Sequence, residues 1–266
     1  MYDAGKRKVD EFLNDGDSAT RVPWNGDMDF RNCYEDEAYA AAYAKLEFPG
    51  TYYLAFRDLP ELIARHICGR QALDFGCGTG RSTRFLAMLG FHAIGIDIAP
   101  EMIRHAQTID PTGDYRLVRD GDLSQFEDGQ FDLIFSAFTF DNVPTREHKT
   151  ALLTELRRIL AAEGRFANVV SAPEIYWHEW ASFSTKSFPE NRQARSGDQV
   201  RIIVTALQDC RPAVDVLWPD EDYRDLYLRA GLRVLDVHRP LGSINDPYEW
   251  VTETSTSPWV IYMLGP

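Results

Sequence analysis

Three glycines stand at every second position in LDFGCGTG, residues 73–80, directly after a short apolar run. Glycine loses more conformational freedom on folding than any other residue, so each one carries a cost in chain entropy. A surface turn does not need Gly76, Gly78 and Gly80 together. The feature therefore predicts that something bound approaches the backbone closely. The alternative is a tight turn that only connects a strand to a helix.

Strand and helix patterns alternate around this loop, from about residue 58 to residue 170. Such alternation predicts a parallel sheet with right-handed crossovers. The two strand patterns that close the chain follow a single helix, which favours an antiparallel edge. The sequence thus predicts an α/β fold with a seven-stranded, mostly parallel sheet, whose strands are expected at 72–75, 91–97, 115–118, 131–138, 165–170, 233–239 and 258–264.

Charge and composition exclude several classes of partner. The formal net charge is −13, from 41 acidic and 28 basic residues, so a nucleic acid or an anionic membrane would be repelled on average. No apolar run approaches the roughly 20 residues of a membrane span, and the N-terminus has no apolar signal region. The four cysteines form neither a C-x-x-C pair nor a zinc-like spacing. A cytoplasmic protein without a metal is expected, and its oligomeric state is left open.

Two common ligands of glycine loops do not suit this one. A dinucleotide site with G-x-G-x-x-G spacing would need its third glycine at 81, where Arg81 stands. No Gly-Lys-Ser/Thr follows, which excludes a phosphate-binding P-loop. The stretch from Asp74 to Gly80 resembles instead the first motif of the class I S-adenosylmethionine (SAM)-dependent methyltransferases, an acid followed by alternating glycines after the first strand. This resemblance implies a Rossmann-like fold and SAM as cofactor, whose ammonium and carboxylate suit an acid and the glycine amides.

Further landmarks of that family follow in order. Asp97 ends the second strand pattern, 19 residues beyond Gly78, where an acid accepts hydrogen bonds from the ribose hydroxyls. The alternative for Asp97 is an acid that only favours a helix N-terminus. The resemblance implies that Ile98 and Met102 flank the adenine, although both could equally be core residues.

The adenine amino group and the methionine end of the cofactor are assigned by the same resemblance. In RDGDL, residues 119–123, Asp122 is expected to accept from the amino group, with the Leu123 amide at the ring. Asp120 is the rival, because a shift in register would exchange the two acids. Tyr52 and Arg57 are candidates for contacts near the methionine carboxylate, or members of an aromatic strap packed on the core.

Catalytic and substrate residues are expected at the carboxyl edge of the sheet. Asp141 could orient an amine or take a proton, or simply cap a turn; many relatives have histidines where Asp141 and Asn142 stand. His178 beside Glu179 is a second candidate base. Aromatic surface of the size found here is usually buried, so we expect aromatic side chains to wall the acceptor pocket. The predicted substrate contacts are Tyr39, Tyr43, Phe138, Asn142, Trp177 and Trp180.

The alternation of strand and helix patterns stops after residue 170. Patterns at 200–207 and 213–218, separated by a turn-like DCRP, predict an inserted β-hairpin near 198–218. We expect one methyltransferase domain over 1–266, made of four parts: an N-terminal helical lid at 24–57, a SAM-binding core at 58–170, a substrate-covering insertion at 171–222 and the C-terminal part of the sheet at 223–266.

These observations predict a methyltransferase that acts on a nucleophilic N, O or C atom of a small molecule, without a metal. Two other functions stay open. The chain could methylate a protein or peptide, or it could be a SAM-binding regulatory protein without turnover.

Overall fold

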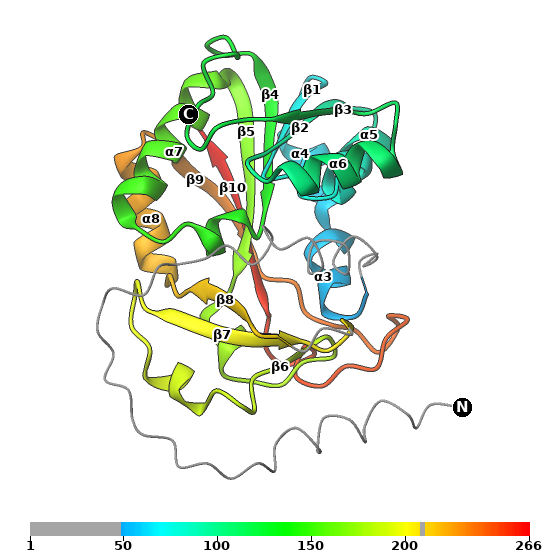
Figure 1. Ribbon diagram of the computed structural model, residues 1–266, viewed down its shortest axis with the longest axis vertical. Coiled ribbons are helices and arrows are strands. Elements are labelled where there is room, and N and C mark those ends of the chain that lie inside the picture. The colour runs from blue at the N-terminus through cyan, green and yellow to red at the C-terminus, as the bar shows by residue number, and fades with distance from the viewer. Residues whose placement is uncertain (1–48, 208–210) are drawn as a thin grey trace. The chain divides into compact units, whose positions relative to one another are not determined.

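The computed structural model describes residues 49–207 and 211–266 (Figure 1). Its main sheet has seven strands in the order β3-β2-β1-β4-β5-β10-β9. The strands are β1 (Gln71–Phe75), β2 (His92–Asp97), β3 (Asp114–Leu117), β4 (Phe131–Ala137), β5 (Leu160–Ser171), β9 (Arg233–His238) and β10 (Trp259–Gly265). The helices are α3 (Thr51–Arg57), α4 (Leu59–His66), α5 (Arg81–Met88), α6 (Pro100–Ile109), α7 (Arg146–Ile159) and α8 (Asp220–Arg229).

Strand directions confirm the predicted Rossmann-like sheet. Strands β1 to β5 pair in parallel, and β10 pairs antiparallel with both β5 and β9. The two closing strands were expected to form an antiparallel edge, and they do, since β9 and β10 pair antiparallel with β9 outermost. Every residue of β10 is buried, whereas β9 begins with an exposed residue and has none that is fully buried. The continuously apolar strand therefore takes the covered position, and β9 forms the edge.

The order of the strands creates a crevice beside β1. The chain moves outward from β1 to β2 and β3, then returns to the other side of β1 at β4. Ligands of open α/β sheets bind outside the carboxyl ends of the strands at such a reversal. Helices α4, α5 and α6 cover one face and α7 and α8 the other, so this crevice lies between two helical layers (Figure 1).

The insertion after β5 carries the predicted hairpin. Strands β7 (Gln199–Val204) and β8 (Ala213–Val216) pair antiparallel, and the short β6 (Phe183–Ser184) extends them to a three-stranded sheet. Between them lie the 3₁₀ turns η3 (Pro173–Tyr176) and η4 (Pro189–Gln193). Strand β8 packs against another 3₁₀ turn, η2 (Thr139–Asn142), which follows β4. This contact brings the insertion to the carboxyl edge of the main sheet.

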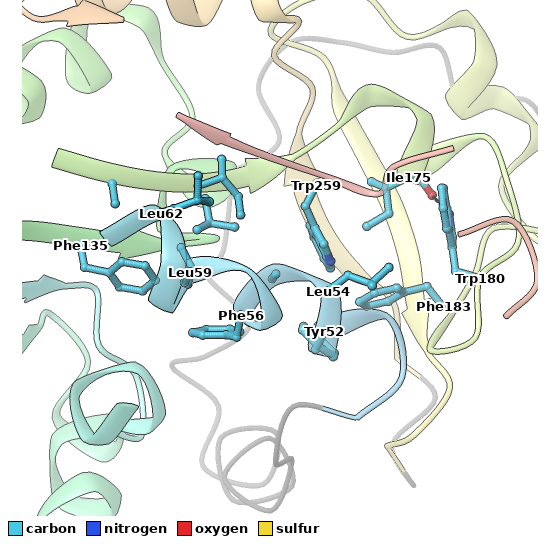
Figure 2. Close-up of a cluster of buried hydrophobic side chains, with 14 of the residues drawn as sticks. Tyr52, Leu54, Phe56, Leu59, Leu62, Phe135, Ile175, Trp180, Phe183 and Trp259 are labelled. Atoms are coloured by element: carbon cyan, nitrogen blue, oxygen red, sulfur yellow. Dashed lines mark hydrogen bonds between the residues drawn. The ribbon is translucent and has the colours of Figure 1, made fainter. Parts of the chain in front are cut away.

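One apolar core joins the insertion to the sheet (Figure 2). Tyr52 of α3 packs against Phe183 of β6 and Trp259 of β10, with ring centroids 4.9 and 5.9 Å apart. The Trp259 indole also donates to the Thr51 carbonyl at 2.8 Å. Burying a large apolar side chain stabilises a fold by about 1.5–3 kcal/mol, so these rings hold α3 and the insertion firmly against the sheet.

Part of the predicted lid, including Tyr39 and Tyr43, lies outside the described residues. Its last residues, from Thr51 to Arg57, form α3. In the described part of the chain, no helix combines the length and the apolar character needed to cross a bilayer.

Candidate functional site

The three glycines of the loop have positive φ angles, but they are needed for different reasons. A Cβ at Gly76 would lie 2.1 Å from the Thr139 hydroxyl, and one at Gly80 would lie 2.6 Å from the Tyr115 ring. Those two glycines permit packing within the protein. At Gly78, with a φ of 54°, a Cβ would have no described atom within 4 Å. A side chain there would extend into open space, so Gly78 is the glycine whose role points to a ligand.

Asp97 fixes this loop at the end of β2. Its Oδ2 accepts from the Gly78 amide at 2.8 Å and its Oδ1 from the Ala99 amide at 2.9 Å. Burial raises the pKa of the carboxyl even though both bonds favour its charged form. Asp97 belongs to the glycine-loop pocket, which is lined by Phe75, Gly76, Gly78, Ile96, Asp97, Ile98, Met102, Val118, Asp120, Ala137, Phe138, Thr139, Asn142, Val143 and Leu152.

Asp74 lies behind the loop and does not line that pocket. Its Oδ2 accepts from the Ser82 hydroxyl at 2.7 Å and the Thr83 hydroxyl at 2.6 Å, which ties β1 to the first turn of α5. Its Oδ1 is buried and receives no hydrogen bond from the described residues. Burial raises the pKa of Asp74 to about 6. One oxygen thus organises the loop, and the other is left able to accept.

The acid expected at the adenine is placed differently from the prediction. Asp122 is exposed and accepts from the Ser124 amide and hydroxyl, at 3.1 and 2.6 Å. Leu123 is buried, and neither residue lines the glycine-loop pocket. The positive φ of Gly121, 72°, turns the chain between the two acids. The rival Asp120 lines the pocket, with its Oδ1 3.0 Å from the His148 Nε2.

Arg57 also lies away from the predicted contact. Its guanidinium pairs with Asp58 and Asp246, at 2.7 and 3.0 Å, and it does not line the glycine-loop pocket. A different arginine lies near Tyr52: the Arg81 guanidinium is 5.4 Å from the centroid of the Tyr52 ring. Arg81 begins α5 and is buried. A cation in the first turn of a helix opposes the helix dipole, and that signal could have singled it out in the sequence.

A second cavity, the aromatic pocket, adjoins the first. It is lined by Tyr52, Phe138, Asp141, Asn142, Ser171, Ile175, Phe183, Ile202, Val204, Ala213, Asp215 and Trp259. Phe138 and Asn142 line both pockets and so mark where they meet. In the described part of the chain, Phe138 is the one residue other than glycine with a positive φ, 66°. Backbone strain of this kind concentrates at functional sites.

Two carboxyls and a lysine lie together beside the aromatic pocket. Asp141 accepts from the Ser171 amide and hydroxyl at 3.0 and 2.8 Å, and from the Tyr223 hydroxyl at 3.3 Å. Asp215 accepts from the Tyr176 hydroxyl at 3.0 Å. Lys149 is fully buried and donates to the Phe140 carbonyl. Burial raises the pKa of both carboxyls and lowers the pKa of the ammonium. The sequence reading missed Lys149 and Asp215.

The aromatic side chains after β5, namely Tyr176, Trp177 and Trp180, line neither of these pockets. The Trp180 indole donates to the Ile175 carbonyl at 2.8 Å, and the Trp177 indole donates to the Asn191 carbonyl at 3.3 Å. His178 is exposed and lines a separate cavity with Trp177, Glu179 and their neighbours. The predicted roles of His178, Trp177 and Trp180 at the acceptor do not fit these positions, because the two indoles are used to pack the insertion.

Two carboxyls with raised pKa values predict how stability changes with pH. Folding raises the pKa of Asp74 from 3.8 to about 6 and that of Asp215 from 3.8 to about 7. The folded state therefore holds more protons than the unfolded state between about pH 4 and pH 7. Raising the pH through this window should lower the free energy of unfolding by about 2 kcal/mol or more, since one pKa unit is about 1.4 kcal/mol. Folding lowers the pKa of Lys149 to about 7, so this residue changes the pH dependence of stability only above about pH 7.

Urea unfolding at several pH values would measure this effect. Asp215→Asn should flatten the slope, whereas Asp122→Asn should not, because the pKa of the exposed Asp122 is lowered by its bonds to Ser124. A wild-type protein that becomes more stable from pH 4.5 to pH 7 would contradict the prediction.

Comparisons with known proteins agree with this geometry. A family model described as "Methyltransferase domain" matches residues 73–168. A ubiquinone biosynthesis O-methyltransferase of Xanthomonas oryzae pv. oryzae is 30% identical over 103 residues, 37% of this chain and 42% of that protein. A 2-methyl-6-phytyl-1,4-hydroquinone methyltransferase of Synechocystis is 34% identical over 100 residues, 36% of this chain and 30% of that protein. The chain thus matches less than half the length of these curated relatives.

Solved structures extend the likeness to the whole fold. A SAM-dependent methyltransferase from Clostridium acetobutylicum superposes with a TM-score of 0.58 at 15% identity, covering 88% of this chain and 99% of that one. Another from Mesorhizobium loti gives a TM-score of 0.57 at 16% identity, covering 79% and 97%. Residues 73–168 thus match a methyltransferase domain, and the sheet order and the solved structures show the fold that the resemblance to the class I SAM-dependent methyltransferases implies.

Proposed function

We propose that the chain transfers the methyl group of SAM to a small molecule, with SAM in the glycine-loop pocket and the acceptor in the aromatic pocket. The observation that carries this proposal is the meeting of the two pockets at Phe138 and Asn142. A displacement reaction needs its two partners in contact and in line, so adjoining pockets supply most of what it requires.

The residues of the glycine-loop pocket suit this cofactor. Gly78 leaves space that a side chain would fill, and Asp97 presents a carboxylate that can accept from ribose hydroxyls. Ile98 and Met102 offer apolar surface for the adenine, and Asp120 an acceptor for its amino group. When bound, the cofactor supplies a methyl group activated by a positively charged sulfur. The protein has to hold the acceptor beside it and exclude water.

The aromatic pocket favours a small acceptor over a protein side chain. Its walls come from α3, η2, the end of β5, η3, the inserted strands β6, β7 and β8, and β10. The rings of Tyr52, Phe138 and Trp259 are in contact, with centroids 4.6–5.9 Å apart. The named relatives act on small quinone-type compounds, which supports the same class. Their matches cover only about 100 residues of this chain, so the acceptor itself follows from the pocket rather than from them.

Calorimetric titration tests the proposal. SAM and its demethylated product S-adenosylhomocysteine should both bind, and NAD should not. Mass spectrometry of a metabolite extract incubated with labelled SAM should then show labelled small molecules. Binding of NAD alone would refute the cofactor assignment, and labelling confined to proteins would favour a protein methyltransferase. Cofactor binding with no labelled product would indicate a regulatory protein.

A further inference from the structure

We propose, building on the proposed function, that the acceptor is a primary or secondary amine on an apolar body, held as a cation between Asp215 and the rings of the aromatic pocket. Asp141 adds to the negative potential of the site. The acceptor atom is then a nitrogen.

The carboxyls of Asp141 and Asp215 differ in how many hydrogen bonds they already accept. Both oxygens of Asp141 already accept hydrogen bonds, from Ser171 and from Tyr223. Asp215 accepts from Tyr176 through Oδ2 only, and no described residue donates to its Oδ1. Because Asp215 lines the pocket, this oxygen is the one that can bind a donor on the acceptor.

The charges around the pocket favour a cation. The charged groups near Asp215 are Asp141 of η2 and Lys149 of α7, and the tyrosines at 176 and 223 are neutral. Two carboxylates and one ammonium leave one negative charge. Lys149 donates to the Phe140 carbonyl and does not line the pocket, so the carboxylates face the acceptor. An uncompensated buried carboxylate is costly, and an incoming ammonium would offset that cost.

The pocket walls add a second preference. Phe138 lies 4.6 Å from Trp259, measured between ring centroids, and ring faces attract cations. The Tyr52 ring already has the Arg81 guanidinium 5.4 Å from its centroid, so Phe138 and Trp259 are the rings that can receive the acceptor. Asn142, where the two pockets meet, has a buried Oδ1 with no partner among the described residues. An N–H of the acceptor can donate to it. A hydroxyl acceptor fits less well, because it would become an anion beside two carboxylates as it lost its proton.

The chemistry balances with groups at hand. The ammonium of the acceptor gives one proton to Asp215 Oδ1, which leaves a neutral amine with a free lone pair. That lone pair forms the new N–C bond to the methyl group supplied by the cofactor, while the S–C bond breaks and its electron pair stays on sulfur. The product nitrogen carries a positive charge that Asp141 stabilises. Asp215 then releases its proton to solvent, one per methyl transferred.

Sequence relatives do not decide this point. The matched methyltransferase domain ends at residue 168, whereas Ser171, Phe183 and Asp215 come after it. Phe138, Asp141 and Asn142 lie inside the matched residues, but most of the aromatic pocket, Asp215 included, is built from parts of the chain that the family model does not cover.

Pairs of probes that differ in one functional group would test the inference. Benzylamine and benzyl alcohol, phenethylamine and phenethyl alcohol, and hexylamine and hexanol should be titrated calorimetrically into the full chain saturated with S-adenosylhomocysteine at pH 7.5. In at least one pair the amine should bind at least about 10-fold more tightly than the alcohol, because a hydrogen bond to a charged group is stronger than one between neutral groups. Asp215→Asn should remove that preference without changing the affinity for S-adenosylhomocysteine, and Asp122→Asn should change neither.

Three results would overturn the inference: equal or tighter binding of the alcohol in every pair, no detectable binding of any amine, or a preference that survives Asp215→Asn. The wild-type ratio decides the question even if the variant fails to fold. If S-adenosylhomocysteine binds and the amines are not preferred, the inference fails while the proposed function stands. If S-adenosylhomocysteine does not bind, the proposed function fails, and the inference with it.

Discussion

Gly78→Val should weaken SAM binding by at least about 100-fold, which corresponds to about 2.7 kcal/mol. A Cβ at this position has no described protein atom within 4 Å, so the valine side chain would extend into the space assigned to the cofactor. The fold should survive, because the added Cβ meets no described atom. The backbone keeps a φ of 54°, which costs a residue other than glycine about 1–2 kcal/mol of stability. Calorimetry with SAM and urea unfolding measure the two effects separately.

Gly231→Val is the matched control for this experiment. Gly231 follows α8, has a φ of 75°, and likewise has no described atom within 4 Å of an added Cβ. It does not line the glycine-loop pocket. Both variants should lose a similar amount of stability, and only Gly78→Val should lose affinity. Equal affinities for SAM in the two folded variants would mean that the loop is only a turn.

The sequence predicted the fold because its signals are local. The spacing of the glycines, the alternation of strands and helices, and the apolar run of β10 each depend on neighbouring residues. The same locality left open which of the two closing strands would be outermost. A pattern of residues shows that β10 is a strand, but its pairing with β5 and β9 depends on which strand needs cover on both faces.

The assignment of the acid expected at the adenine depends on the conformation of one turn. Asp120 and Asp122 are separated only by Gly121, and the sequence alone does not show which acid the turn directs toward the pocket. The positive φ of Gly121 leaves Asp122 bonded to Ser124 and Asp120 at the pocket. The sequence pattern therefore names both acids as candidates, but it does not show which of them lies at the pocket.

The acceptor side could not have been predicted from local patterns. Asp141 and Asp215 lie far apart in the chain, and only the packing of β8 on η2 brings them to one cavity. Lys149 reads as an ordinary cation on an amphipathic helix, although it is fully buried. The tryptophans of the insertion were expected at the acceptor because of their number. They pack instead against the insertion itself, since indole N–H groups need buried partners.

Asp97→Ala should weaken SAM binding by about 30- to 1,000-fold, because it removes a charged acceptor for two hydroxyls, worth roughly 2–4 kcal/mol. The structure adds a second reason, since Asp97 also accepts from the amides of Gly78 and Ala99 and so holds the loop in position. Calorimetric titration with SAM measures the loss of affinity. Asp97→Asn keeps one oxygen acceptor and should lie between the wild type and the alanine variant.

Asp122→Ala is the control for Asp97→Ala, because Asp122 is an exposed acid that does not line the glycine-loop pocket. It should bind SAM as the wild type does. Burial raises the pKa of Asp97, so removing its carboxyl also removes a desolvation cost from the folded protein. That gain opposes the loss of two hydrogen bonds, and the stability of Asp97→Ala should change less than its affinity. Unchanged affinity in a folded Asp97→Ala variant would refute the assignment of Asp97, whereas reduced affinity in a folded variant supports it.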